Sequence, residues 1–167
     1  MIDITKQLKL NKLVFLELLK GVDSDFITWR PSKEKWCLLE IICHLYDEER
    51  DDFRFRVKWV LDNPEKPPPP FNPLDWIIER KYMNQDYGFM VQEFIKERDD
   101  SVLWLQSLEN ANWDNSYYHE EKGELSARYY LSNWLAHDYL HMRQIIKQKF
   151  DYLEYLSESD LNYAGKW

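Results

Sequence analysis

The segment Tyr130–Ile146 reads YLSNWLAHDYLHMRQII and predicts the long helix around which the fold is arranged. It contains no proline or glycine, and its apolar residues recur every three or four positions. His137 and His141 are four residues apart, so a helix places them one turn apart on one face. Two imidazoles in that arrangement can reach the same metal ion. The segment therefore predicts two metal ligands on one helix.

A third ligand is expected from another part of the chain. The sequence contains 4 histidines, and the best remaining one is His44, which lies in the apolar segment Leu38–Leu45. Imidazoles on apolar faces of two helices indicate a metal ion inside a helical bundle. Three neutral imidazoles suit zinc or nickel and leave a position open for water or a thiolate. The alternative is that these are ordinary core or surface histidines, because two histidines four apart also occur on helices by chance.

Composition limits the class of protein. The 167 residues fit a single domain, 1–167, that can bury a core without disulfides or a metal. The net charge of -8 and the lack of a basic face argue against a nucleic-acid partner. No apolar stretch predicts a signal peptide or a membrane span. Cys37 and Cys43 are expected to be reduced, which indicates a cytoplasmic protein. The aromatic content of 16% suggests additional apolar surface and hence a homodimer.

Hydrophobic periodicity predicts an all-α fold, a four-helix bundle. The segment Asn63–Pro70, NPEKPPPP, cannot continue a helix, because proline lacks the amide donor and restricts the residue before it. We therefore expect a long connection between the second and third helices, which permits a crossover. The segments 22–35 and 109–125 are expected to be loops without strands, and the tail 151–167 is expected to pack on the bundle. The four long helices are predicted at about 4–20, 36–62, 86–108 and 126–150, with a short helix near 74–80.

Two segments of the chain resemble the DinB/YfiT-like superfamily. Trp36–Leu45, WCLLEIICHL, is similar to the family's pattern of a tryptophan, an acidic or amide residue and then His-Leu, and His137–His141, HDYLH, is similar to its HxxxH motif. The resemblance implies a four-helix bundle, a three-histidine site with zinc or nickel, and frequent homodimers. Characterised relatives use low-molecular-weight thiols, such as bacillithiol and mycothiol, in transferase or isomerase reactions. Glu40 stands where those thiol transferases tend to carry glutamine, which leaves the use of a thiol open.

Acidic residues near His44 supply candidates for catalysis. Glu48 follows His44 by four residues and shares its helical face, so it can hydrogen-bond a ligand imidazole or act as a base. For the run Asp47–Asp52 as a whole, a solvated acidic face is the favoured interpretation, with Glu48 as the exception. The segment His137–His141 nearly matches the metalloprotease motif HExxH, but Asp138 replaces the required glutamate.

The remaining candidates have ordinary structural explanations. His119 is expected on the surface and Cys43 in the core. Tyr130 and Trp134 precede His137 on its helix and can either wall the site or pack in the core. The sequence thus favours a cytoplasmic metal-dependent enzyme, a thiol-dependent S-transferase or hydrolase, that activates a thiol or water against a small electrophile. The rival hypotheses are a non-catalytic metal-binding or stress-response bundle and a helical interaction protein without a metal.

Overall fold

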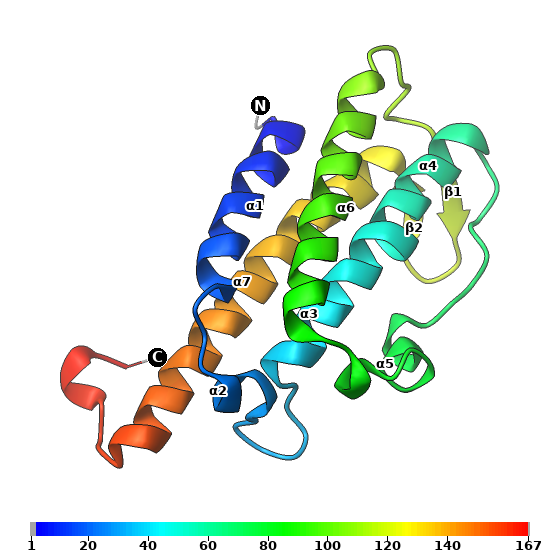
Figure 1. Ribbon diagram of the computed structural model, residues 1–167. Coiled ribbons are helices and arrows are strands. Elements are labelled where there is room, and N and C mark those ends of the chain that lie inside the picture. The colour runs from blue at the N-terminus through cyan, green and yellow to red at the C-terminus, as the bar shows by residue number, and fades with distance from the viewer. Residues whose placement is uncertain (1–2, 167) are drawn as a thin grey trace.

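The computed structural model describes residues 3–166 and is a bundle of four long helices (Figure 1). The predicted all-α fold is confirmed. The second long helix is continuous but contains a π-helical segment, η1, between its two α-helical parts, α3 and α4. The long helices are α1 (Ile4–Leu19), α3 (Leu38–Asp47) with η1 (Glu48–Phe53) and α4 (Arg54–Asp62), α6 (Tyr87–Ser107), and α7 (Ala127–Ser157). The short elements are α2 (Ser24–Thr28), η2 (Pro73–Asp75), α5 (Trp76–Glu79), η3 (Tyr82–Asn84), β1 (Ser116–His119), β2 (Gly123–Ser126) and η4 (Asn162–Ala164).

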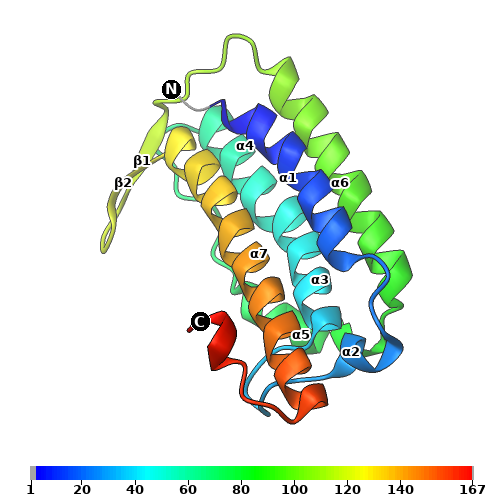
Figure 2. The ribbon, with the colours of Figure 1, turned by 90° about the vertical axis from the view of Figure 1, so that its left-hand side faces the viewer.

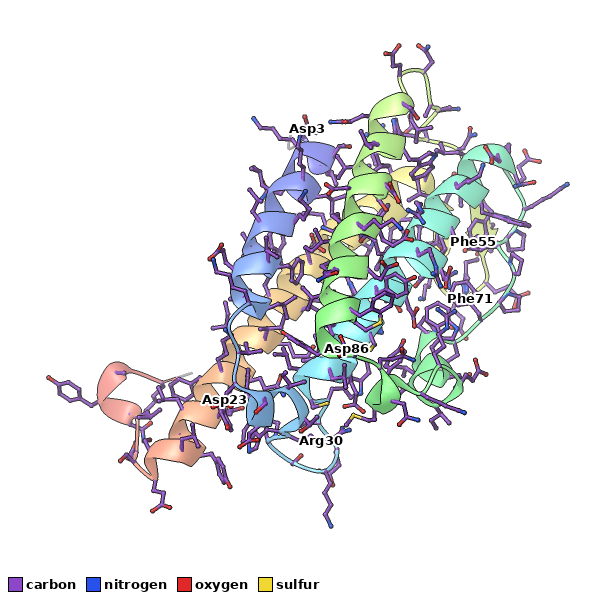
Figure 3. The ribbon with its side chains drawn as sticks, viewed as in Figure 1. Asp3, Asp23, Arg30, Phe55, Phe71 and Asp86 are labelled. Carbon is purple, nitrogen blue, oxygen red and sulfur yellow. The ribbon has the colours of Figure 1, made fainter. Side chains whose placement is uncertain are left out.

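The bundle does not have a simple up-down-up-down topology. Helix α1 packs against α6 and α7, and the α3–α4 helix packs against the same two helices. The connection from Asn63 to Asp86 therefore travels back along the bundle, and α6 runs in the same direction as α3–α4 (Figure 1). Phe71 anchors this connection to Phe55 of α4, with ring centroids 6.1 Å apart (Figure 3). The expected long crossover connection is confirmed.

Side chains at the helix ends explain where the long helices begin. Asp3, Asp86 and Ser126 each accept a hydrogen bond from a backbone amide in the first turn of α1, α6 and α7, respectively. These bonds satisfy amides that have no partner inside the helix. Gly21 follows α1 with a φ of 61°, a conformation that glycine adopts without strain. The observed boundaries thus follow from local chemistry, although α7 continues beyond the predicted end at residue 150.

The core consists of two apolar clusters. One gathers around Phe15, Phe94 and Ile145, and the other around Leu8 and Trp134. On three of the long helices, buried polar residues lie in sequence between residues of the two clusters. These polar residues are Asn11 on α1, Arg98 and Ser101 on α6, and Asp138 and His141 on α7. A polar layer therefore crosses the middle of the bundle.

Three sequence-based expectations for the connecting segments were wrong. Residues 116–119 and 123–126 form an antiparallel hairpin at one end of α7 (Figure 2), in a segment expected to lack strands. Each strand has only 4 residues, too few for a clear alternation. Segment 22–35 contains the short helix α2. Most residues of the segment 158–166 are exposed, so this part of the tail does not pack on the bundle as expected; Trp167 lies outside the described residues.

None of the described helices is both long enough and apolar enough to cross a bilayer.

Candidate metal centre

The three candidate histidines meet between α3 and α7. His44 comes from α3 and His137 and His141 from successive turns of α7, and one ring nitrogen of each lies within 4.8 Å of those of the other two. The Nε2 atoms of His137 and His141 are 3.0 Å apart. Two nitrogens bound tetrahedrally to one zinc at about 2.0–2.1 Å are about 3.3 Å apart. One ion can therefore contact all three rings after small side-chain movements.

The cluster keeps all three imidazoles neutral. Burial lowers the pKa of His44 to about 3, with a smaller effect from His141. Burial also lowers the pKa of His141 to about 4 and moves the pKa of His137 well below its usual value. The neutral ring is the form that binds metals, so a proton does not need to leave at neutral pH.

Two ring nitrogens of the cluster lack a conventional hydrogen-bond partner. The Nδ1 atoms of His44 and His141 are buried, and neither has a hydrogen-bond partner among the described residues. Buried polar atoms normally have partners, and such exceptions often accompany an ion or a catalytic role. The Nδ1 atom of His44 faces Glu48, so the donor set that fits a divalent metal ion is the group of neighbouring ring nitrogens between α3 and α7.

Aromatic rings enclose the cluster. Trp36 packs edge-on against His44, with ring centroids 4.8 Å apart, and Phe53 lies 4.9 Å from the ring of His137. Trp36 lies two residues before the start of α3, and Phe53 is the last residue of η1. These rings exclude water, which explains the strong effect of burial on the imidazole pKa values.

Glu48 lies where its spacing from His44 predicts. Its side chain is 5% exposed, and its Oε1 atom is 3.7 Å from His44 Nδ1. Burial raises the pKa of Glu48 to about 9, and the nearby carboxylate of Asp52 contributes to the same shift. A divalent ion bound to His44 would add positive charge here and favour the carboxylate form of Glu48.

The expected solvated acidic face is wrong for Asp47, Glu49 and Asp52, which are buried; Glu48, the expected exception, is buried as well. Asp47 accepts hydrogen bonds from Tyr82 and Arg80, and Glu49 turns to the opposite side of the helix. Charged groups are rarely buried without such partners. Because Arg80 lies 33 residues further along the chain, no local pattern could identify it as the partner of Asp47.

Sequence reasoning missed the fully buried Arg98. Its guanidinium donates to both oxygens of Glu49 at 2.8 Å and to both oxygens of Asp138 at 2.7 Å. Trp134 also donates to Glu49, and Asn11 to Asp138. Burial alone would lower the pKa of Arg98, but the two carboxylates raise it further than burial lowers it. A sequence signal did exist, because Arg98 lies four residues after Phe94 and four residues before Val102, on the apolar face of α6.

This network excludes the metalloprotease interpretation of the motif on α7. Asp138 is fully buried, and Arg98 and Asn11 occupy its carboxylate. It therefore has no access to a substrate. Instead, Arg98 fixes Asp138, which directly follows His137, and Glu49, which directly follows Glu48.

Two cavities reach the histidine cluster. The first has a volume of about 690 Å³ and reaches His137, and the second has a volume of about 590 Å³ and reaches His141. Leu140 lines both. The first cavity is also lined by residues from η1, α4, the proline-rich connection, the hairpin and α7, among them Asp52, Phe53, Arg56, Phe71, Tyr117, Tyr129, Tyr130 and Asn133. Both volumes are typical of small-molecule sites.

Some of the sequence candidates line these cavities and others do not. Tyr130 lines the first cavity, where its hydroxyl is 2.6 Å from that of Tyr117, whereas Trp134 is a core residue. His119 is partly buried and lines the first cavity, but it is not part of the histidine cluster. Cys43 is fully buried in the apolar core, as expected.

Glu40 stands where the thiol transferases tend to carry glutamine, and its carboxylate is bonded away from the histidine cluster. Its carboxylate accepts from the backbone amide of Cys37 at 2.9 Å and from Arg30 at 2.7 Å. It therefore closes the first turn of α3 and fixes the preceding loop.

The fold and the site define a helical-bundle protein with a buried three-histidine cluster that can hold a metal ion. The chain belongs to the DinB superfamily, whose sequence model matches residues 7–145. Among solved structures it is similar to YfiT from Bacillus subtilis, described as a probable metal-dependent hydrolase with an unusual four-helix bundle topology. The identity is 14% and the TM-score 0.75, and the match covers 87% of this chain and 83% of YfiT. No curated protein matches the chain. The expected family is confirmed.

Proposed function

We propose that the protein is a metal-dependent enzyme in which His44, His137 and His141 bind one divalent ion. The observation that carries this proposal is the set of three neighbouring, neutral imidazoles, two buried and that of His137 partly buried, which two cavities reach. The description of YfiT as a probable metal-dependent hydrolase supports it. Zinc and nickel are the ions that best suit three nitrogen ligands and an open position.

The bound ion would polarise a substrate oxygen or lower the pKa of a bound water or thiol. Glu48 would then accept a hydrogen bond from His44 Nδ1 and hold the ring in its coordinating orientation. Glu48 does not line either cavity beside the cluster, whereas Asp52 lines the first one and pairs with Arg56. We therefore assign the proton-accepting role toward a substrate to Asp52, next to Glu48.

The attacking group is either water or a low-molecular-weight thiol. Water corresponds to a hydrolase and a thiol to an S-transferase. Glu40 does not distinguish the two, because its carboxylate is engaged with Arg30 and the backbone of α3. In both reactions the small electrophile would occupy the first cavity, because Asp52 lines it.

Two assays on the same protein test the proposal. Metal-free protein is reloaded with zinc or nickel and assayed for hydrolysis of p-nitrophenyl acetate, and then for transfer of cysteine to 1-chloro-2,4-dinitrobenzene. We expect a rate in at least one assay that requires the ion and falls about a hundredfold in Asp52→Asn, the range for loss of a proton-transfer group. Equal rates with and without bound ion in both assays would favour the rival, a non-catalytic metal-binding bundle.

We also propose a homodimer formed through α1 and α7. Residues seven apart on α7 fall on one side of the helix, and this side exposes apolar residues next to the exposed apolar residues of α1. Large exposed apolar surfaces are typical of interfaces. The residues are Leu10, Leu13 and Val14 of α1 and Tyr139, Ile146 and Leu153 of α7. Light scattering should give twice the chain mass, and Leu13→Glu should reduce it to a monomer; a wild-type monomer at micromolar concentration would contradict the proposal.

A further inference from the structure

The cavity beside His141 has a charge opposite to that of the chain as a whole. The formal net charge of the chain is -8, yet the charged side chains that line this cavity are Lys35, Arg143, Lys147 and Asp151. Lys147 pairs with Asp151, so Lys35 and Arg143 leave a positive excess. Among residues 3–166, no ion pair involves Arg143. The lining therefore favours an anionic ligand.

Gln148 adds a second, independent feature of this cavity. Its side chain is 3% exposed, and its Nε2 atom donates to the backbone oxygens of Trp29 and Trp36, both at 3.1 Å. These two bonds fix the orientation of the amide, because only the nitrogen can donate. The buried Oε1 atom of Gln148 has no hydrogen-bond donor among the described residues. A ligand with an N–H or O–H group in this cavity would supply one.

The position of the cavity connects it to the histidine cluster. Trp36 lines the cavity and packs against His44, and His141 lines it directly. Figure 2 shows the loop that follows α2 passing beside the C-terminal half of α7. This cavity and the one that contains Asp52 share Leu140 and reach His141 and His137, respectively, on successive turns of α7.

We propose that this second cavity binds a small carboxylate that also carries an N–H or O–H donor. Arg143 binds the carboxylate, Gln148 Oε1 accepts from the donor, and Trp36 contacts the body of the ligand. This inference rests on the proposed function in one respect only: the cavity lies beside a metal ion if the histidine cluster binds one. Binding itself does not require the ion, because neither Arg143 nor Gln148 belongs to the histidine cluster.

Three matched probes separate the two recognition elements. Glutamate carries carboxylates and an ammonium donor, glutarate carries the carboxylates alone, and glutaramide carries no charge. Each is titrated into metal-free and metal-loaded protein, and the NMR signals of the Trp36 indole and the Gln148 amide are followed. We expect saturable binding in the order glutamate, glutarate, glutaramide, with the same order in both forms of the protein.

The variant Arg143→Gln should weaken glutamate binding about tenfold, as expected for loss of one charge-assisted hydrogen bond. Arg128→Gln is the matched control, because Arg128 lies on the same helix outside the cavity and the change in charge is equal. An unchanged dissociation constant in Arg143→Gln, or shifts that require the metal, would overturn the subsite. Absence of metal binding with intact glutamate binding would instead contradict only the proposed function.

Discussion

Two groups of buried polar residues lie side by side in this bundle and differ in how well their hydrogen bonds are satisfied. In the Arg98 network, the guanidinium, both carboxylates, Trp134 and Asn11 all have partners. In the histidine cluster, two ring nitrogens have none, and burial lowers the pKa of all three rings. The Arg98 network supplies its own partners, whereas the three imidazoles present neighbouring ring nitrogens that one metal ion can share. The contrast explains why we assign the first to positioning and the second to metal binding.

Removing the cation from the satisfied network should have the largest effect on stability. Arg98→Met leaves the buried carboxylates of Glu49 and Asp138 without their main partner. We expect the free energy of unfolding to fall by about 3–5 kcal/mol, the usual cost of breaking a buried ion pair. Chemical denaturation of the metal-free protein measures this change.

Arg54→Met provides the control, because Arg54 pairs with Glu97 at 2.6 Å near the surface of the bundle. That change should cost about 0–1 kcal/mol. Similar losses in the two variants would mean that the Arg98 network does not hold the bundle together more than a peripheral pair does.

The histidine cluster should make the metal-free protein sensitive to acid. The folded state holds His44 and His141 neutral down to a pKa of about 3 and about 4, whereas unfolded histidine binds a proton below about 6.5. The unfolded state thus binds more protons between these values, and the free energy of unfolding falls as the pH falls. Each ring contributes a slope of about 1.4 kcal/mol per pH unit, or about 2 kcal/mol between pH 6.5 and 5.

Comparing metal-free wild type with metal-free His44→Gln isolates this effect. Glu48, whose pKa of about 9 gives an opposite dependence, is present in both proteins and cancels in the difference. Denaturation curves from pH 4 to 7 should differ in slope by one proton. Parallel curves would mean that His44 is protonated as easily in the folded as in the unfolded state.

A smaller effect is expected from Glu48→Gln, which removes the charge beside His44 but keeps the shape of the side chain. The metal affinity should fall about tenfold, as is usual for loss of a partner that orients a ligand histidine. Competition with a chromophoric chelator measures the affinity. Asp47→Asn is the adjacent control and should leave the affinity unchanged, because Asp47 faces Tyr82 and Arg80. Equal losses in both variants would assign no special role to Glu48.

Local patterns predicted the parts of this molecule that local chemistry determines. The helices, the break at Asn63–Pro70 and the shared face of His137 and His141 follow from periodicity, proline and spacing. The position of His44 relative to that pair was inferred from its apolar context and from the family resemblance. The structure brings the three rings together as the sequence suggested.

The partners of the buried carboxylates could not be predicted in this way. Arg98 lies 49 residues from Glu49 and 40 from Asp138, so only the packing of α6 against its neighbours brings them together. The run Asp47–Asp52 looked solvated because nothing in its own sequence shows that cations will cover it. The position of Asp52 in a cavity wall depends likewise on the hairpin and the proline-rich connection, which complete the same cavity.

Metal content of protein purified without a histidine tag tests the central claim most directly. After loading with zinc or nickel and removal of excess ion, elemental analysis should give one ion per chain in the wild type. His44→Ala, His137→Ala and His141→Ala should each lose most of the ion, and His119→Ala, the matched control outside the cluster, should keep it. A wild type without a stoichiometric ion, or a His44→Ala variant that binds as much as the wild type, would contradict a three-histidine metal site.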